Sequence, residues 1–317
     1  MLKLITPKNR SLVQILRKEH IDFINNPHSF SIPERDLSAP PPVTFSFEPA
    51  ISATLTLCDS HGNERSYQAK NGKAEIYNLK VGESYSWYVS TGFMRSETYS
   101  FTTDSTAPRL LYVDGLSNVR DIGGFRTTGG RLIKQGMVYR STEGDKNYSI
   151  TENGLKALTD ELEIRAELDV RGINGESFGE IFRGLDVKRY NVALSAYGEI
   201  FTDTQKLAYS RVFELLADKS NYPLLVHCQS GMDRPGTLLV SLCSLLGVDE
   251  GDAMLDYEMS SFSTWGNRSR DSAQFCEFMK KFHSYGKSAE QAANGFLISC
   301  GIQQKTLDTV RDILIED

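Results

Sequence analysis

The sequence lacks long apolar runs and any excess of positive charge. None of its apolar runs approaches the roughly 18 residues that span a bilayer, which excludes an integral membrane protein. Its 35 lysines and arginines are outnumbered by 41 aspartates and glutamates, giving a net charge of −6. Binding to nucleic acid through overall positive charge is therefore excluded. Any anionic ligand must be held by a local site.

Paired cysteines and metal-binding motifs are also missing. The five cysteines form no C-x-x-C pair and no even-numbered framework, and the five histidines show no H-x-x-x-H spacing. These absences argue against a disulfide scaffold and a zinc site, and we expect neither metal nor cofactor. The N-terminal MLKLITPKNR has no signal-peptide core, so we expect a cytoplasmic protein, or an exported one if a leader has been removed.

Length and composition predict more than one domain. A chain of 317 residues with 40% hydrophobic and 24% charged residues is globular and long for one core. Apolar spacing over 9–26 predicts a helix, and three prolines at 40–42 indicate a linker. We expect an N-terminal helix and Pro-rich linker over 1–42, a small all-β sandwich over 43–104 and an α/β domain over 109–317.

The stretch from 43 to 103 has the period-two pattern of strands. Its β-rich runs VTFSF, ATLTLC, KAEIYNL, SYSWYVS and ETYSFTT are separated by turn residues. Tyr85 and Trp87, two positions apart, would face one core. The run NLKVGESYSWYVS resembles a corner and strand of fibronectin type III-like modules. Such a module would bind another protein or chain, and no catalytic site is expected in it.

Strands and helices alternate in the last 209 residues, 109 to 317. Runs at 164–170 and 224–228 predict buried strands, and 235–246 predicts an apolar helix. Ser149-x-x-Glu152 and Ser288-x-x-Gln291 are capping-box signatures for two further helices. This alternation predicts a central, mostly parallel sheet flanked by helices.

The segment LLVHCQSGMDRPGT, residues 224–237, contains the most informative motif. It passes from a predicted buried strand through a tight loop into a helix. Amides at such a junction can converge on an anion, Gly231 permits a backbone that side chains forbid, and Arg234 offers a fork for two phosphate oxygens. The same groups favour a thiolate at Cys228, with a pKa of roughly 3.5–7.5. The pattern predicts a cysteine nucleophile that faces a bound phosphate.

The remaining loop residues have expected supporting roles. Asp233 is the carboxylate best placed to protonate a leaving oxygen, with Asp169 and Asp145 in reserve. His227 is expected to orient the loop rather than act as a base. The residues expected to bind substrate through the loop are Gln229, Ser230, Gly231 and Met232.

HCQSGMDR matches the H-C-x-x-G-x-x-R signature of cysteine-dependent protein tyrosine and dual-specificity phosphatases. NVRDIGGF (118–125), GMVYRS (136–141) and ELDVRG (167–172) resemble ordered blocks of the bacterial atypical branch of these enzymes. The resemblance covers 109–317. It implies a phosphocysteine intermediate on Cys228, no metal, and the loop aspartate, Asp233, as the acid. The expected substrate is a phosphorylated protein or a small phosphomonoester.

Two positions depart from this family. Members that act on phosphoinositides usually carry lysine where this chain has Met232, which disfavours such substrates. A serine or threonine usually follows the loop arginine and eases departure of the sulfur, but this chain has Pro235, and Thr237 lies too far along. A phosphate- or phosphopeptide-binding protein with little turnover therefore stays open.

Other polar residues are expected to be structural. Arg120 and Asp121 fit a turn with an ion pair, and Arg140 and Arg171 fit paired arginines better than substrate ligands. Arsenate reduction would need a resolving cysteine, and the nearest one to the motif, Cys243, is expected in the core. Phosphomonoester hydrolysis is the function that the sequence favours.

Overall fold

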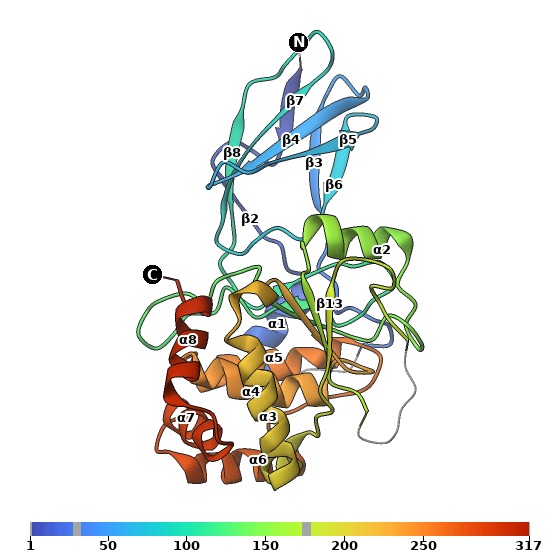
Figure 1. Cartoon of the computed structure of the whole chain (residues 1–317). Helices are drawn as coiled ribbons and strands as arrows, with labels where there is room; N and C mark the ends of the chain where they lie inside the picture. The colour runs from blue at the N-terminus through green and yellow to red at the C-terminus, as the bar shows by residue number, and fades with distance from the viewer. Residues whose placement is uncertain (1, 28–32, 173–178, 317) are drawn as a thin grey trace. The chain divides into compact units, whose positions relative to one another are not determined.

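The computed structural model describes residues 2–27, 33–172 and 179–316, and the chain divides into two compact units (Figure 1). The first unit holds residues 2–27 and 40–109, and the second holds 33–39 and 110–316. Residues 33–39 therefore belong to the second unit, although most of the first unit follows them in the chain.

The first unit consists of two β-sheets around one core. One sheet has the order β1 (Lys3–Thr6), β3 (Val43–Glu48), β6 (Lys73–Ile76). The other has the order β2 (Ser11–Val13), β8 (Tyr99–Thr103), β7 (Ser84–Ser90), β4 (Ala53–Asp59), β5 (Glu64–Ala69). Tyr85 and Trp87 are both buried, and the Trp87 ring meets Phe45 of the other sheet edge-on, with centroids 5.0 Å apart. Their shared core is confirmed, whereas the fibronectin-like identity stays a prediction.

Two segments of this unit differ from the sequence prediction. The single helix predicted over 9–26 is wrong at its start, because β2 pairs in parallel with β8 and α1 spans only Lys18–Asn25. Leu12, which lies in the stretch predicted as a helix, is 69% exposed in strand β2. Strand β5 was not predicted, because its largely polar, exposed sequence carries no period-two apolar signal.

The second unit is built on a mixed, mostly parallel sheet, as predicted. Its order is β13 (Lys188–Asn191), β12 (Ala166–Asp169), β14 (Leu224–His227), β11 (Val138–Ser141), β10 (Arg120–Asp121), β9 (Arg109–Leu110). The first four strands are parallel and β10 is antiparallel to β11. Every residue of β11, β12 and β14 is buried, which is why their sequences do not alternate.

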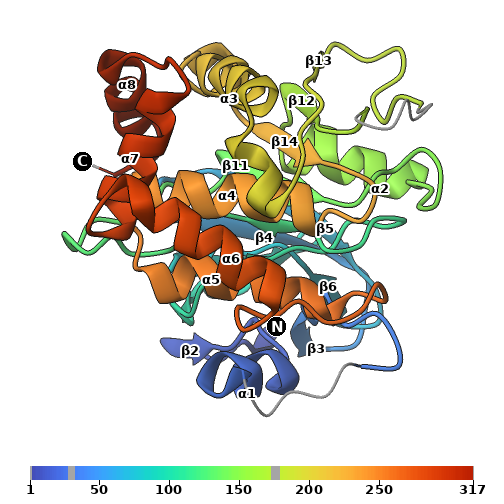
Figure 2. The same cartoon turned by 90° about the horizontal axis from the view of Figure 1, so that it is seen from below.

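Helices flank this sheet (Figures 1 and 2). Leu158 and Leu162 belong to a core cluster that also contains Tyr139 of β11 and Leu225 of β14. The helical elements are α2 (Glu152–Lys156), the π-helix η2 (Ala157–Glu161), η3 (Tyr197–Phe201), α3 (Asp203–Leu216), η4 (Lys219–Asn221), α4 (Asp233–Leu245), α5 (Glu250–Glu258), η5 (Met259–Phe262), α6 (Ala273–Phe282), η6 (His283–Tyr285), α7 (Ala289–Ser299) and α8 (Gln304–Leu314).

One of the two predicted helix caps is confirmed. The Ser288 hydroxyl accepts the backbone N–H of Gln291 at 3.2 Å and caps α7. The cap predicted at Ser149 is wrong by two residues, because the Thr151 hydroxyl accepts the N–H of Gly154 at 3.1 Å and begins α2. Both hydroxyl residues carry the same local signal, and the backbone path chooses between them.

The carboxyl ends of the three central strands meet at one edge of the sheet. Ser141 of β11 and Asp169 of β12 both lie in register with His227 of β14. The loops that leave these strands therefore converge, as they do at the binding edge of parallel sheets. In the described part of the chain, no helix combines the length and apolarity needed to cross a bilayer.

Candidate active site

The loop that follows β14 joins the central strand of the sheet to the N-terminus of α4. His227 ends the strand, and α4 begins at Asp233 with Met232 as its N-cap residue. The motif predicted from the sequence thus forms a strand–loop–helix unit, with Cys228 as the first residue beyond the sheet. The positive end of the α4 dipole faces the loop.

Donors outside the loop bind its carbonyl oxygens. The side-chain amide of Asn118 donates to the carbonyl of Ser230 at 3.3 Å and to that of Gly231 at 3.1 Å. The backbone N–H of Glu143 donates to the carbonyl of Gln229 at 3.1 Å. Since a peptide N–H points opposite to its C=O, outward carbonyls turn the intervening amides inward.

A buried arginine also binds the loop carbonyls. We call Asn118, Glu143 and this arginine, Arg140, the clamp of the loop. Arg140 donates from Nη2 to the carbonyls of Gly231 (2.7 Å) and Met232 (3.0 Å), and its Nη1 pairs with Asp256. Asp256 also accepts Arg120 Nε at 2.9 Å, and each of these three charged side chains is at most 3% exposed. Burial, aided by Arg140, lowers the pKa of Arg120 to about 10, so Arg120 stays protonated at neutral pH. Both arginines are structural, as predicted.

Gly231 permits the loop to lie this close to the neighbouring strand. Its φ is +67°, and a Cβ added there would lie 2.2 Å from the carbonyl oxygen of Ser141. The backbone amides of Gly231 and Ser230 act on the Cys228 sulfur in the direction that lowers the pKa of its thiol. The loop therefore presents amides toward the sulfur, which is the arrangement of an anion-binding nest.

Cys228 is 4% exposed at the base of this loop. Burial raises the pKa of its thiol above the usual value, while the Arg234 guanidinium and the amides of Gly231 and Ser230 act in the opposite direction. The lowered pKa expected from the sequence is therefore not found, because removal from water outweighs the local positive charge. The thiol must lose its proton before it can attack.

Asp233 carries contacts that its sequence position did not indicate. Its carboxylate is bound in bidentate fashion by Arg268, with Nε–Oδ1 at 2.6 Å and Nη2–Oδ2 at 2.9 Å, and the Tyr197 hydroxyl also donates to Oδ1. Burial opposes ionisation, but the Arg268 and Tyr197 contacts outweigh it and hold the pKa of Asp233 below its usual value. Asp233 is therefore a carboxylate at neutral pH in this arrangement.

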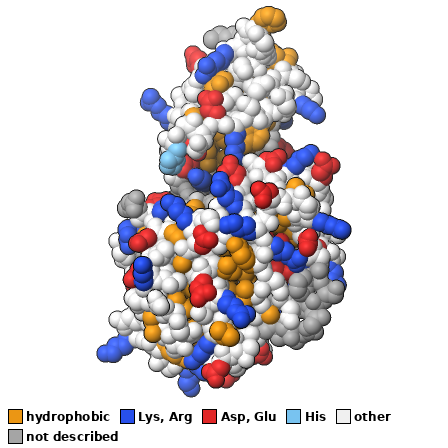
Figure 3. Space-filling view, in the orientation of Figure 1, with side chains coloured by type: hydrophobic (Ala, Val, Ile, Leu, Met, Phe, Trp, Pro, Cys, Tyr) orange, Lys and Arg blue, Asp and Glu red, His pale blue; other side chains and the backbone are white. Residues whose placement is uncertain are grey.

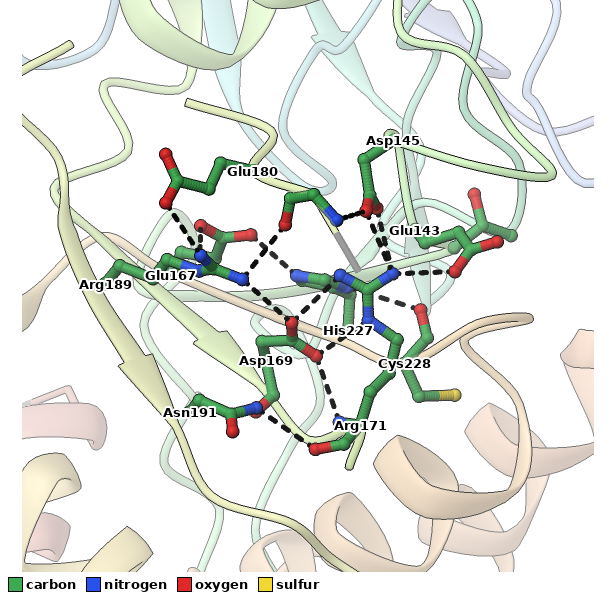
Figure 4. A network of polar contacts seen from close by, with 12 residues as sticks. Glu143, Asp145, Glu167, Asp169, Arg171, Glu180, Arg189, Asn191, His227 and Cys228 are labelled. Atoms are coloured by element: carbon green, nitrogen blue, oxygen red, sulfur yellow. Dashed lines mark hydrogen bonds and ion pairs between the residues drawn. The ribbon is translucent and has the colours of Figure 1, made fainter. Parts of the chain in front are cut away.

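Asp169 and Asp145, the two alternative candidates for the acid, both bind Arg171. Arg171 donates to both carboxylate oxygens of Asp169 at 2.9 Å, to Asp145 at 2.9 Å and to Glu143 at 2.7 Å. Figure 4 shows both aspartates turned toward Arg171, whereas the Cys228 sulfur points away from them. The network joins the loop after β11 to the end of β12 and the residues that follow it, and Arg171 is paired as predicted.

His227 is fully buried behind the loop. Its Nε2 lies 2.8 Å from a carboxylate oxygen of Glu167 on β12, and its Nδ1 lies 3.3 Å from the carbonyl of Cys228 (Figure 4). The ring thereby connects the nucleophile's backbone to the neighbouring strand. This placement suits an orienting residue.

The two positions that depart from the family pattern, Met232 and Pro235, are both buried. Met232 has no exposed surface, so it offers the site only its backbone. Pro235 is buried in the first turn of α4. The hydroxyl of Thr237 donates to the carbonyl of Asp233 at 2.8 Å and accepts the N–H of Tyr197 at 3.1 Å. Both contacts of this hydroxyl are therefore with the backbone of Asp233 and Tyr197.

Some residues that contact the loop or Asp233 were not predicted as site residues from the sequence. They come from distant segments of the chain. Asn118 and Arg140 lie within NVRDIGGF and GMVYRS, so the family blocks carried a signal for them. Tyr197 and Arg268 lie 36 and 35 positions from Asp233 in the sequence, and no motif marks them. Over residues 2–27, 33–172 and 179–316, no three His, Cys, Asp or Glu side chains are grouped to hold a metal ion.

On the face shown in Figure 3, acidic and basic side chains are interspersed without a broad field of one sign. This face therefore offers an anion no extended basic surface.

Two solved structures resemble the chain distantly. The core catalytic domain of Siw14, a PP-IP phosphatase of S. cerevisiae crystallised with citrate, is 18% identical, with coverage of 48% of this chain and 90% of its own and a TM-score of 0.34. TpbA of P. aeruginosa in complex with phosphotyrosine is 14% identical, with coverage of 54% and 90% and a TM-score of 0.34. Likenesses at this level do not bear on substrate or activity.

Sequence comparison is more decisive. A candidate tyrosine-protein phosphatase of Cupriavidus necator is 26% identical over 172 residues, 46% of this chain. The match spans 61% of that relative, less than two thirds of its length. The model of the tyrosine phosphatase family matches residues 111–316, which contain the loop, its clamp and every strand and helix of the second unit except β9. The chain therefore belongs to the tyrosine phosphatase family.

Proposed function

We propose that this protein is a phosphomonoesterase of the protein tyrosine/dual-specificity type that acts through a phosphocysteine on Cys228. The observation that supports it best is the loop of inward amides around the Cys228 sulfur, fixed by Asn118 and Arg140 on its outer side. Arg234, which acts electrostatically on that sulfur, would bind two phosphate oxygens together with the loop amides.

The reaction would proceed in two displacements at phosphorus. In the first, the Cys228 thiolate forms the S–P bond as the ester P–O bond breaks, and Asp233 in its protonated form gives its proton to the leaving oxygen. In the second, water attacks the phosphocysteine, its proton returns to the Asp233 carboxylate, and the S–P bond breaks to release phosphate and thiolate. No redox partner is needed.

The proposed substrates are phosphorylated proteins or small phosphomonoesters. A phosphoinositide is less favoured, because the fully buried Met232 supplies no cation for a second phosphate. Hydrolysis of phosphotyrosine, phosphoserine and phosphoinositide substrates, compared by kcat/KM, tests this preference. A higher kcat/KM for a phosphoinositide than for phosphotyrosine would contradict it.

Replacement of the nucleophile tests the reaction itself. We expect Cys228→Ser to reduce hydrolysis of phosphotyrosine and p-nitrophenyl phosphate to background, because a serine hydroxyl in this loop is not ionised. The matched control is Cys276→Ser, at an exposed position on α6, which should retain full activity. Unchanged activity in Cys228→Ser would reject the mechanism.

A second candidate is a phosphate- or phosphopeptide-binding protein with little turnover. It is favoured by Pro235 and by the engagement of the Thr237 hydroxyl with Asp233 and Tyr197, which leave the second displacement without the usual family hydroxyl. Rapid-mixing kinetics separate the two candidates. Our proposal expects product to accumulate over many turnovers, whereas the alternative expects a single burst equal to the enzyme concentration.

A further inference from the structure

Two side chains from outside the phosphate loop control the environment of Asp233. Arg268 lies between η5 and α6, and Tyr197 begins η3. Both contact the carboxylate directly, at a helix end where Asp233 is only 30% exposed and Arg268 22% exposed. Neither residue touches Cys228 in any described contact, so they act through Asp233.

We propose that Arg268 and Tyr197 are positioning residues that hold Asp233 as a fixed carboxylate in the free enzyme, so that the form with a protonated acid is scarce and kcat/KM at neutral pH is limited. This inference rests on the proposed function, in which Asp233 must carry a proton when the ester bond breaks. The same two contacts that orient the carboxylate also oppose its protonation.

The contact with Arg268 is of the strongest kind between side chains. Both carboxylate oxygens face the guanidinium fork, at 2.6 and 2.9 Å. Such a charge-assisted bidentate pair fixes the plane of the carboxylate and favours its ionised form. Partial exposure screens the pair, so we expect its effect at the lower end of the range for ion pairs.

Tyr197 is held in an unfavourable backbone conformation where its hydroxyl reaches Asp233. Its φ is +55°, in the left-handed region that aromatic residues rarely occupy. The backbone N–H donates to Thr237 Oγ1 at 3.1 Å, and the hydroxyl also lies 2.8 Å from that of Tyr257. The Tyr257 ring is stacked on Phe275 with centroids 4.4 Å apart, which fixes the far end of this chain of hydroxyls.

The charged and titratable groups with the largest described effects on Asp233 come from several elements around it. Arg268 and Tyr197 contact it, Arg140 of β11 adds a weaker positive influence, and Tyr257 of α5 and Cys228 of the loop lie within electrostatic range. Arg268 and Arg140 favour the carboxylate, and a thiolate at Cys228 would oppose it. The Arg268 contact is the largest of the influences that favour ionisation.

The test is the pH dependence of kcat/KM for p-nitrophenyl phosphate in the full chain. The reactive free enzyme carries a thiolate at Cys228 and a proton on Asp233, whereas the prevailing form carries the thiol and the carboxylate. In that case kcat/KM rises through the pKa of Asp233, stays level, and falls through the pKa of Cys228, and its level value is set by the fraction of the reactive form. Removal of the pair in Arg268→Gln should raise this level value of kcat/KM by up to about tenfold. The alkaline fall, which follows Cys228, should stay in place.

Three variants separate this effect from general disruption. Tyr197→Phe should raise the level value of kcat/KM by less, and Arg268→Lys, which keeps the charge, should stay close to wild type. Arg270→Lys is the matched control, because Arg270 pairs with Glu258 instead and should leave the level value unchanged. Thermal unfolding identifies any variant that does not fold, in which case Tyr197→Phe carries the test.

A carboxyl ¹³C NMR titration of Asp233, assigned with Asp233→Asn, reads the same effect without activity. An upward shift of the Asp233 pKa in Arg268→Gln supports the proposal, and an unchanged titration overturns it. A level value of kcat/KM that is unchanged in both Arg268→Gln and Tyr197→Phe overturns it as well. Failure of the proposed function is distinguishable, because it would appear as hydrolysis that survives Cys228→Ser.

Discussion

At the residue scale, burial and local positive charge compete for the same two ionisable groups. Cys228 is nearly inaccessible, and burial raises its pKa despite the Arg234 guanidinium and the loop amides. Asp233 is partly exposed and directly paired, and its pKa falls despite burial. The free enzyme thus favours a thiol and a carboxylate, the reverse of the thiolate and acid that the first displacement requires.

Alkylation of Cys228 should report this balance. Because iodoacetamide reacts with the thiolate, a raised pKa predicts a rate that climbs with pH and does not level off below pH 9.0, the usual thiol value. Mass spectrometry of the labelled peptides measures the rate, with exposed Cys276 as an internal reference. A plateau at or below about pH 7 would show that the amides and Arg234 outweigh burial.

At the element scale, the shape of the phosphate loop depends on groups that lie beneath it. Asn118, Arg140 and Glu143 each bind loop carbonyls, and Arg140 is in turn fixed by the buried Asp256. The strand–loop–helix segment supplies the nucleophile, but neighbouring strands and loops impose its conformation. Gly231 is the position where an added side chain would disturb this conformation most.

Gly231→Ala should abolish hydrolysis and lower stability. The φ of +67° costs an L-residue about 1–2 kcal/mol, and the added methyl would meet the Ser141 carbonyl at 2.2 Å. Thermal unfolding and kcat measure the two effects. The control is Gly129→Ala, where the new Cβ meets only Thr127 Oγ1 at 3.7 Å, and equal behaviour of the two variants would contradict the role given to Gly231.

At the scale of the whole molecule, the phosphatase unit includes chain that precedes the first unit's β3. Ser38 Oγ accepts the backbone N–H of Asn118 at 2.9 Å, Asp36 accepts the Ser117 hydroxyl, and the N–H of Leu37 donates to the carbonyl of Phe262 at 2.9 Å. This segment lies outside the family match, which begins at residue 111. It supports Asn118, whose side chain binds the phosphate loop.

A double variant, Asp36→Asn with Ser38→Ala, should weaken this support. Loss of the buried Asn118–Ser38 hydrogen bond and weakening of the partly buried bond between Ser117 and Asp36 together cost about 2 kcal/mol. This corresponds to a fall of about 4–8 °C in Tm for a domain of this size. We also expect kcat to fall, since Asn118 loses a fixed partner. Differential scanning calorimetry and steady-state kinetics measure both, with exposed Ser60→Ala as control, and wild-type values for both would refute the role of the segment.

Local patterns predicted most of the elements that position the site. The buried strands β12 and β14, helix α4 and the cap at Ser288 follow from apolar runs and capping residues that act within a few positions. The strand β2 and the cap of α2 were misread, because pairing with β8 and the path of the backbone override local preference. Asn118 and Arg140 were within recognisable blocks, although their contacts with the loop were not predictable from them.

By itself, the sequence determined the composition of the loop and helix start after β14, because Cys228, Gly231 and Arg234 lie in one short continuous segment. Only the tertiary structure decided which protonation states Cys228 and Asp233 favour. Arg268 and Tyr197 reach Asp233 from segments about 35 residues away, on opposite sides of it in the chain, and the solvent accessibility of Cys228 depends on packing from every side. Spacing along the chain is a one-dimensional property, whereas electrostatic environment is a sum over neighbours in three dimensions.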